Sequence, residues 1–275
     1  MLKCRLSRIW IAICFAASVF AVSICFAQKT SLKYHLVWSD EFSYRGLPDS
    51  AKWNYETGGS GWGNNELQNY TAYDTGTAKV FDGCLHLSAQ QKSVNGKPYY
   101  TSARLTTKTK GDWTYGKIEV RAKLPEGRGL WPAIWMMPTG DAYGDWPASG
   151  EIDIMEHVGY NKDSVFGSLH SKTYNHHIGT QKTKGIFIKH PYDAFHVYGL
   201  EWTPDQIHFL VDGKVFYQVA NEHKTFSEWP FDKPFHLLLN LAVGGNWGGK
   251  YGVDDAVFPA TMLVDYVRVY QGSSK

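Results

Sequence analysis

The chain has 275 residues, of which 15% are aromatic and 20% are charged, and its 28 basic and 26 acidic side chains nearly balance. A chain this close to neutral lacks the basic excess typical of a nucleic-acid-binding protein, so no nucleic-acid partner is expected. The length suits one large domain, because no repeat and no Pro/Ser-rich linker divides it.

Residues 1–27 hold three basic side chains, no acidic ones and an apolar run that ends in "CFA" before Gln28. This pattern predicts a cleaved signal peptide and a secreted protein, extracellular or periplasmic, with no membrane contact after cleavage. An uncleaved anchor is the alternative, since the run is nearly long enough to span a bilayer. A lipoprotein site at Cys25 is disfavoured by the bulky Ile24 before it.

Removal of that segment changes two properties of the chain. Three basic residues leave, so 28 becomes 25 against 26 acidic residues, and the net charge is about −1. Of four cysteines only Cys84 stays, so no internal disulfide forms. Residues 28–275 must therefore be stabilised by a core, and we expect them to form a single domain.

Two-residue alternation recurs along residues 28–275, whereas long helical periodicity is nearly absent. In "YGKIEVRAKL", residues 115–124, apolar residues at every second position predict a strand with one core face and one wet face. In "GLWPAIWMMP", residues 129–138, the same period puts Trp131, Ala133 and Trp135 on one face. That face is either a platform for sugar rings or ordinary core. Pro132 fits a central strand poorly, because it lacks a ladder donor.

The stretch "EIDIME", residues 151–156, carries three carboxylates on an otherwise apolar segment. Glu151 and Asp153 share a face, but strict alternation would bury Glu156. A β-bulge at about Met155 would return Glu156 to the Glu151 face, and bulges are frequent beside active sites. The two glutamates would then approach the roughly 5–5.5 Å separation of a retaining glycosidase.

These residues have three interpretations. Glu151 and Glu156 are a nucleophile and an acid/base, with Asp153 between them orienting a neighbour. Alternatively, the carboxylates are a site for a hard cation, or a solvated strand face. "YNHHIG", residues 174–179, is not interpreted as a transition-metal site, because neighbouring histidines on a strand point in opposite directions.

The remaining strands complete an all-β prediction. "IHFLVDGKVFYQV", residues 207–219, reads as a hairpin around the turn Asp212-Gly213, and "TMLVDYVRVY", residues 261–270, as another strand. So many strands predict a two-sheet sandwich, because one sheet of this size would leave a face uncovered.

Taken together, these stretches resemble glycoside hydrolase family 16, and in particular its laminarinase-type endo-1,3-β-glucanases. The resemblance extends in order through "WSDEF", "GWGNNELQNYT", "YTSARLTTK", "GLWPAIWMMP", "GEIDIMEHVG", "FHVYGLEWTPDQIHFLVDG", "NLAVGGNWGG" and "DYVRVY". It implies a jelly-roll β-sandwich of two curved antiparallel sheets with an open concave cleft. It also implies that Glu151 is the nucleophile, Asp153 its assistant and Glu156 the acid/base.

The resemblance implies further residues. Substrate is expected to contact Asn64, Glu66, Arg104, Trp131, Trp135, His170 and Trp247. For Arg104 and His170 the alternative is structural hydrogen bonding under the cleft. No cofactor is expected for catalysis, but a structural Ca²⁺ is, held by Glu41, the Gly83 carbonyl and Asp265. Glu41 and Asp265 are otherwise salt-bridged residues at strand ends.

The expected protein is thus a secreted, monomeric, retaining endo-glycosidase whose partner is a β-1,3-glucan polysaccharide. Mixed-linkage β-1,3-1,4-glucan or an algal galactan is the alternative substrate within the same fold. A non-catalytic polysaccharide-binding sandwich is the alternative from another class, and the presence of both glutamates argues against it.

Overall fold

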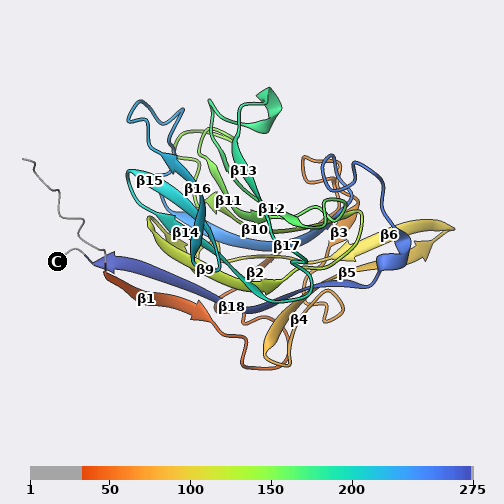
Figure 1. Cartoon of the computed structure of the whole chain (residues 1–275). Helices are drawn as coiled ribbons and strands as arrows, with labels where there is room; N and C mark the ends of the chain where they lie inside the picture. The colour runs from red at the N-terminus through yellow and green to blue at the C-terminus, as the bar shows by residue number, and fades with distance from the viewer. Residues whose placement is uncertain (1–32, 274–275) are drawn as a thin grey trace, which may run out of the picture. The chain divides into compact units, whose positions relative to one another are not determined.

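A computed structural model describes residues 33–273, and the prediction for residues 1–27 lies outside them. The described residues form two stacked β-sheets, both visibly curved (Figure 1). One sheet has ten strands and the other has eight. Two short 3₁₀ helices, η1 (His176–Ile178) and η2 (Asp255–Val257), are the helical elements of this part of the chain.

In the ten-stranded sheet, the first and last strands of the described residues pair with each other. In spatial order its strands are β16 (Lys214–Ala220), β15 (Gln206–Val211), β14 (His196–Trp202), β9 (Gly116–Lys123), β18 (Ala260–Ser273), β5 (Cys84–Val94), β6 (Lys97–Ser102) and β3 (Gln68–Tyr70), with β1 (Lys33–Asp40) paired to β18 and β4 (Ala78–Phe81) paired to β5.

The eight-stranded sheet carries the functional residues. In spatial order its strands are β13 (Lys182–Phe187), β12 (Ser164–His170), β11 (Glu151–Glu156), β10 (Leu130–Pro138), β17 (Phe235–Val243), β7 (Arg104–Thr106) and β2 (Asn54–Glu56), with β8 (Asp112–Trp113) paired to β17. All named strand pairs of both sheets are antiparallel except β3 with β6, which is parallel.

This arrangement confirms the predicted jelly-roll sandwich, and the alternation of β9 shows how it is stabilised. Ile118, Val120 and Ala122 are fully buried between the sheets, while the residues between them are only partly covered. Apolar residues of both sheets join in one core cluster, which includes β17 of the functional sheet. The hydrophobic effect therefore holds the sheets face to face.

The predicted hairpin is also confirmed. β15 and β16 pair across Asp212 and Gly213, whose φ angles are 50° and 74°. Positive φ at both central residues matches the right-handed twist of the two strands.

The faces of β10 agree with the alternation, and the structure explains Pro132. Ile134 and Met136 are fully buried, whereas Trp131 and Trp135 are partly covered on the opposite face. The Pro132 carbonyl accepts a hydrogen bond from the His157 N–H, just beyond the end of β11. Since the N–H and C=O of one residue point to the same side, the donor that proline lacks would face His157 as well, so the bond it cannot make lies beyond the named end of β11.

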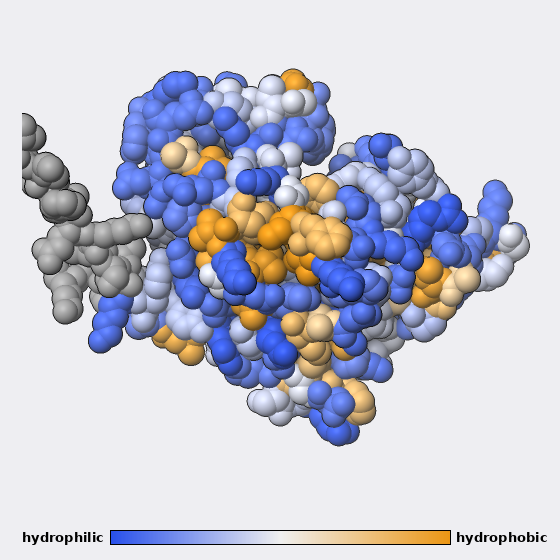
Figure 2. Space-filling model, viewed as in Figure 1, coloured by the Kyte–Doolittle hydropathy of each residue, from blue (hydrophilic) through white to orange (hydrophobic). Residues whose placement is uncertain are grey.

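The surface is mostly hydrophilic in the view of Figure 2, with a large apolar patch near the middle of that face and smaller ones around it. In the described part of the chain, no helix is long and apolar enough to cross a membrane.

Candidate active site

A cavity of about 320 Å³ opens on the outer face of the eight-stranded sheet, which is the upper sheet in Figure 1. All three carboxylates of β11 and both tryptophans of β10 line it. The lining residues are Trp62, Gly63, Asn64, Glu66, Arg104, Trp131, Ala133, Trp135, Met137, Trp146, Glu151, Asp153, Glu156, His176, His177, Asn240 and Ala242. Sequence stretches far apart therefore converge on one cleft.

A β-bulge brings the third carboxylate into this cleft, as predicted. In the pairing of β10 with β11, Ile134 is opposite Met155 but Trp135 is opposite Asp153, so Ile154 is the extra residue. Ile154 and Met155 are both buried in the core. Two consecutive residues therefore face the core, and Glu156 returns to the cleft face that Glu151 and Asp153 share.

Asp153 lies at the centre of the carboxylate group. It is almost completely buried, and its Oδ2 is 3.2 Å from Nε2 of His170. The same histidine nitrogen is 4.0 Å from Oε1 of Glu151. His170 is opposite Glu151 on the neighbouring strand β12 and does not line the cavity itself. His170 therefore lies under the carboxylates. This agrees with the alternative given for this residue, structural hydrogen bonding under the cleft.

Burial of three carboxylates together disfavours their charged forms. Desolvation, followed by the charge of Asp153, raises the pKa of Glu151 to about 8, and desolvation raises the pKa of Asp153 to about 7. The pKa of Glu156 is raised well above its usual value by the same burial and by Asp153. The group therefore retains protons at neutral pH, as a site with one acid and one nucleophile requires.

Each of the two glutamates accepts a hydrogen bond from a tryptophan. The Trp131 indole N–H donates to Oε1 of Glu156 at 3.1 Å, and the Trp146 indole N–H donates to Oε2 of Glu151 at 2.6 Å. These bonds fix the direction of each carboxylate.

Trp135 on β10 and Arg104 on β7 also line the cleft and contact each other. The guanidinium of Arg104 lies 4.6 Å from the ring centres of both Trp62 and Trp135, and its Nε pairs with Oε2 of Glu56 at 2.5 Å. The Trp135 indole N–H donates to Asn240 Oδ1 at 2.7 Å. Arg104 therefore both lines the cleft and orients the neighbouring tryptophan rings.

Of the other residues predicted to contact substrate, two line the cleft and one packs behind a lining residue. Asn64 and Glu66 line it, and Glu66 accepts hydrogen bonds from Asn64 and Gln68. Trp247 is not among the lining residues, but its ring packs edge-on against Trp131 with centroids 5.5 Å apart. Trp247 supports the cleft wall in this structure.

The interpretation of "YNHHIG" assumed that its two histidines lie on a strand, and this assumption is wrong. His176 and His177 lie on the 3₁₀ turn η1 and not on a strand, so both line the cleft. Trp62, Trp146 and Asn240 also line the cleft and were not predicted. Trp62 lies in the quoted "GWGNNE" stretch and Trp146 lies five residues before Glu151, so proximity to the motifs was the available signal.

The residues proposed for calcium are paired with arginines. Both carboxylate oxygens of Glu41 accept from Arg268, at 3.0 and 2.8 Å, so its side chain does not suit a cation ligand. Arg121 contacts Asp265 through Oδ2 at 2.6 Å, which leaves Oδ1 and main-chain carbonyls as donors. Among residues 33–273, the grouping of three His, Cys, Asp or Glu side chains compact enough for a metal is Glu151, Asp153 and His170. Calcium binding stays a prediction.

A curved sheet whose cleft is lined by carboxylates and tryptophans is typical of a carbohydrate-active β-sandwich. Comparison with known proteins agrees with this class. The model of glycosyl hydrolases family 16 matches residues 65–268. A β-glucanase of Rhodothermus marinus is 54% identical over 245 residues, which are 86% of this chain and 85% of the relative. A glucan endo-1,3-β-glucosidase of Cryptopygus antarcticus is 39% identical over 267 residues, covering 92% and 97% of the two chains.

Solved structures agree with the sequence relatives. The laminarinase of Rhodothermus marinus superposes with a TM-score of 0.86 at 52% identity, covering 88% of this chain and 99% of that one. This chain belongs to glycosyl hydrolases family 16.

Proposed function

We propose that this protein is an endo-1,3-β-glucanase that hydrolyses laminarin-type β-glucans with retention of configuration. The observation that carries the proposal is the bulge at Ile154, which lets Glu151, Asp153 and Glu156 line one cleft together with Trp131 and Trp135. The similarity to proteins named β-glucanase, laminarinase and glucan endo-1,3-β-glucosidase supports the choice of substrate.

In the first step, a carboxylate oxygen of Glu151 bonds to the anomeric carbon while the glycosidic C–O bond breaks. Glu156 gives its proton to the departing sugar oxygen, and its raised pKa keeps that proton available at neutral pH. Asp153 contacts His170, and its charge raises the pKa of Glu151, so a proton taken up by Asp153 would remove that opposition and favour the ionised nucleophile.

In the second step, water attacks the anomeric carbon of the glycosyl-enzyme and the bond to Glu151 breaks. Glu156, now ionised, accepts the proton of that water, which restores both glutamates. Two inversions leave the product in the β configuration.

Proton NMR of fresh laminarin digests tests the mechanism, because the β-anomer of the new reducing end should appear first. Glu151→Gln should reduce activity by several orders of magnitude without loss of the fold, since no glycosyl-enzyme can form. An α-anomer as first product would rule out the roles given to both glutamates.

Product analysis on laminarin, curdlan, lichenan and a sulfated galactan, measured side by side, tests the substrate. We expect the highest turnover on laminarin and curdlan. Faster cleavage of lichenan or the galactan would replace the β-1,3-glucan assignment with one of its alternatives, and binding without cleavage would indicate a non-catalytic sandwich.

We further propose that residues 1–27 are removed on export and that the mature protein acts outside the cytoplasm as a monomer. The basic start and apolar run of that segment support export. The intact mass of protein from the culture medium or periplasm should begin at Gln28, and light scattering should give the mass of one chain.

A further inference from the structure

We propose that Trp146 is a positioning residue for the nucleophile, whose indole N–H favours the ionised form of the Glu151 carboxylate and holds that carboxylate in one orientation. The inference rests on the proposed function in taking Glu151 as the nucleophile. Trp146 lies outside the catalytic strand, in the loop that precedes it, and lines the cleft.

The contact itself has the geometry of a strong hydrogen bond. Nε1 of Trp146 lies 2.6 Å from Oε2 of Glu151, and the acceptor is partly buried, with 16% of its side chain exposed. A donor that faces an ionised acceptor is worth about twice as much as one between neutral groups. The bond also restrains the carboxylate against rotation, which matters because attack requires an aligned oxygen.

The indole ring is held in turn by the histidine pair of η1. The centroid of Trp146 is 5.0 Å from that of His176 and 4.8 Å from that of His177. Asn175 fixes this turn, since its side chain accepts from the His177 N–H at 3.1 Å and donates to the Ser171 carbonyl at 3.2 Å. The ring therefore packs against a turn that is itself hydrogen-bonded.

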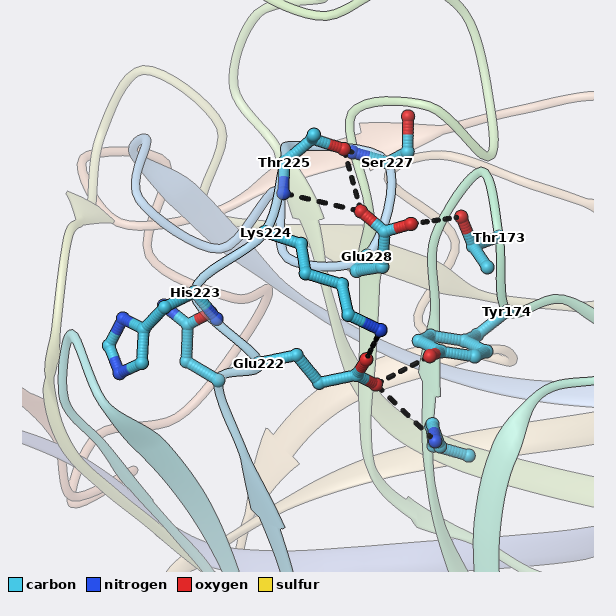
Figure 3. A network of polar contacts seen from close by, with 10 residues as sticks. Thr173, Tyr174, Glu222, His223, Lys224, Thr225, Ser227 and Glu228 are labelled. Carbon is cyan, nitrogen blue, oxygen red and sulfur yellow. Dashed lines mark hydrogen bonds and ion pairs between the residues drawn. The ribbon is translucent and has the colours of Figure 1, made fainter.

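The loop that carries Trp146, residues 139–150, and the loop that carries η1, residues 171–181, both contact the segment 222–232. Figure 3 shows Glu228 between Thr173 and Thr225, with Thr173 Oγ1 donating to Oε1 of Glu228 at 3.2 Å. In the loop that carries Trp146, the ring of Tyr143 stacks on the ring of Phe226 with centroids 4.7 Å apart. These contacts stabilise the position of Trp146 before substrate arrives.

The charged and titratable groups around Glu151 oppose its ionisation unless a donor compensates. Burial, followed by Asp153 on the same strand, raises the pKa of Glu151, whereas His170 from β12 and the Trp146 N–H lower it. His176, which packs on Trp146 and His170, has its pKa lowered to about 4 by burial, so it is neutral at working pH. The indole N–H is thus one of two groups that favour the charged nucleophile.

Trp146→Phe tests the inference, because it keeps an aromatic ring and removes the N–H. With an activated aryl β-glucoside, whose leaving group needs no proton, kcat/KM should fall about 10- to 100-fold. The acidic limb of the pH profile of kcat/KM should move upward by about one pH unit, because the free-enzyme nucleophile becomes harder to ionise. Added azide should not restore the rate, since the first step is slowed.

Two further variants separate positioning from shape. Replacement of Trp146 by β-(3-benzothienyl)alanine keeps a bicyclic ring without the N–H, and it should reproduce both effects. Trp229→Phe is the matched control, because the Trp229 N–H is buried without a hydrogen-bond partner in the described structure and lies outside the cleft. It should leave the pH profile unchanged.

The outcomes discriminate clearly. A fall in kcat/KM together with the pH shift in both Trp146 variants supports the inference. A fall without a pH shift, or no change at all, overturns it in favour of a role in packing or substrate contact. Glu151→Gln that stays active would instead overturn the proposed function, independently of the Trp146 result.

Discussion

At the scale of single residues, tryptophan serves the cleft in two ways at once. Trp131 and Trp135 present flat apolar faces on the cleft side of β10, and each also directs its N–H to a polar partner, Glu156 or Asn240. An aromatic ring with a fixed N–H offers contact area for a sugar at little loss of conformational entropy. Loss of such a residue should therefore affect substrate turnover more than folding.

Trp135→Ala provides the test. We expect kcat/KM on laminarin to fall roughly tenfold, because a stacking surface and a support of Arg104 are lost together. The core residue Trp53, only 1% exposed, is the matched control, and Trp53→Ala should destabilise the fold by about 3–5 kcal/mol. Thermal melts and laminarin kinetics of both variants check this. A large melting shift with unchanged kinetics for Trp135→Ala would favour a core role.

The charge state of Glu151 should affect stability as well as activity. Its pKa is raised to about 8 in the fold from an ordinary value near 4.5, so the stability it contributes is complete below pH 4.5 and is lost as the pH rises toward 8. Glu151→Gln removes this loss. The melting temperature of the variant should exceed that of the parent by about 2–4 °C or more at pH 8 and match it at pH 4. Equal shifts at both pH values would contradict the raised pKa.

Some residue positions could be predicted and others could not, for a physical reason. Alternation along β10 and one extra residue in β11 decide which side chains face the cleft, so Trp131, Trp135 and Glu156 were predictable. The partner of an indole N–H depends on side-chain torsions and on distant loops. For that reason the bond from Trp146 to Glu151 had no signal in the sequence.

At the scale of elements, local backbone conformation determines where the strands depart from regular pairing. The bulge in β11 and the proline in β10 both depart from regular pairing, and each lies beside the carboxylates. The histidines of η1 were misjudged because a 3₁₀ turn of three residues leaves no periodicity from which to recognise it. Strands such as β9 and β10, of eight and nine residues, were recognised because alternation repeats within them.

The turn between β15 and β16 offers a test of this backbone argument. Gly213 has a φ of 74° and open space around its Cα, so Gly213→Ala should destabilise the fold only through its backbone conformation, by about 1–2 kcal/mol. Gly140→Ala is the matched control, because that residue has equal space without a positive φ. Denaturant unfolding of both variants checks the difference. Equal stability would mean that the turn relaxes without strain.

At the scale of the whole molecule, the cleft is assembled from segments that are far apart in sequence. Arg104, Trp131, Glu151 and Asn240 come from four different strands, and β10 lies between β11 and β17 in the sheet. The sandwich class followed from strand number and alternation. The jelly-roll arrangement was implied by the family resemblance, and the spatial order of the strands was not predicted, because pairings between distant strands leave no local pattern.

The ten-stranded sheet carries the last prediction, a stabilising calcium ion near Asp265 on β18. The Asp265 side chain contacts Arg121 through Oδ2, so Oδ1 and nearby main-chain carbonyls, including that of Gly83, are the oxygens that a hard cation would use. A ligand that binds only the folded state raises its stability by RT ln(1 + [L]/Kd). Millimolar calcium should then raise the melting temperature of chelator-treated protein, and Asp265→Asn should abolish that rise. Glu41→Gln is the control, since both side-chain oxygens of Glu41 are bound to Arg268 and the calcium response should persist. If chelation leaves the melting temperature unchanged and no calcium co-purifies, the ion pair with Arg121 accounts for Asp265 and the calcium site is wrong.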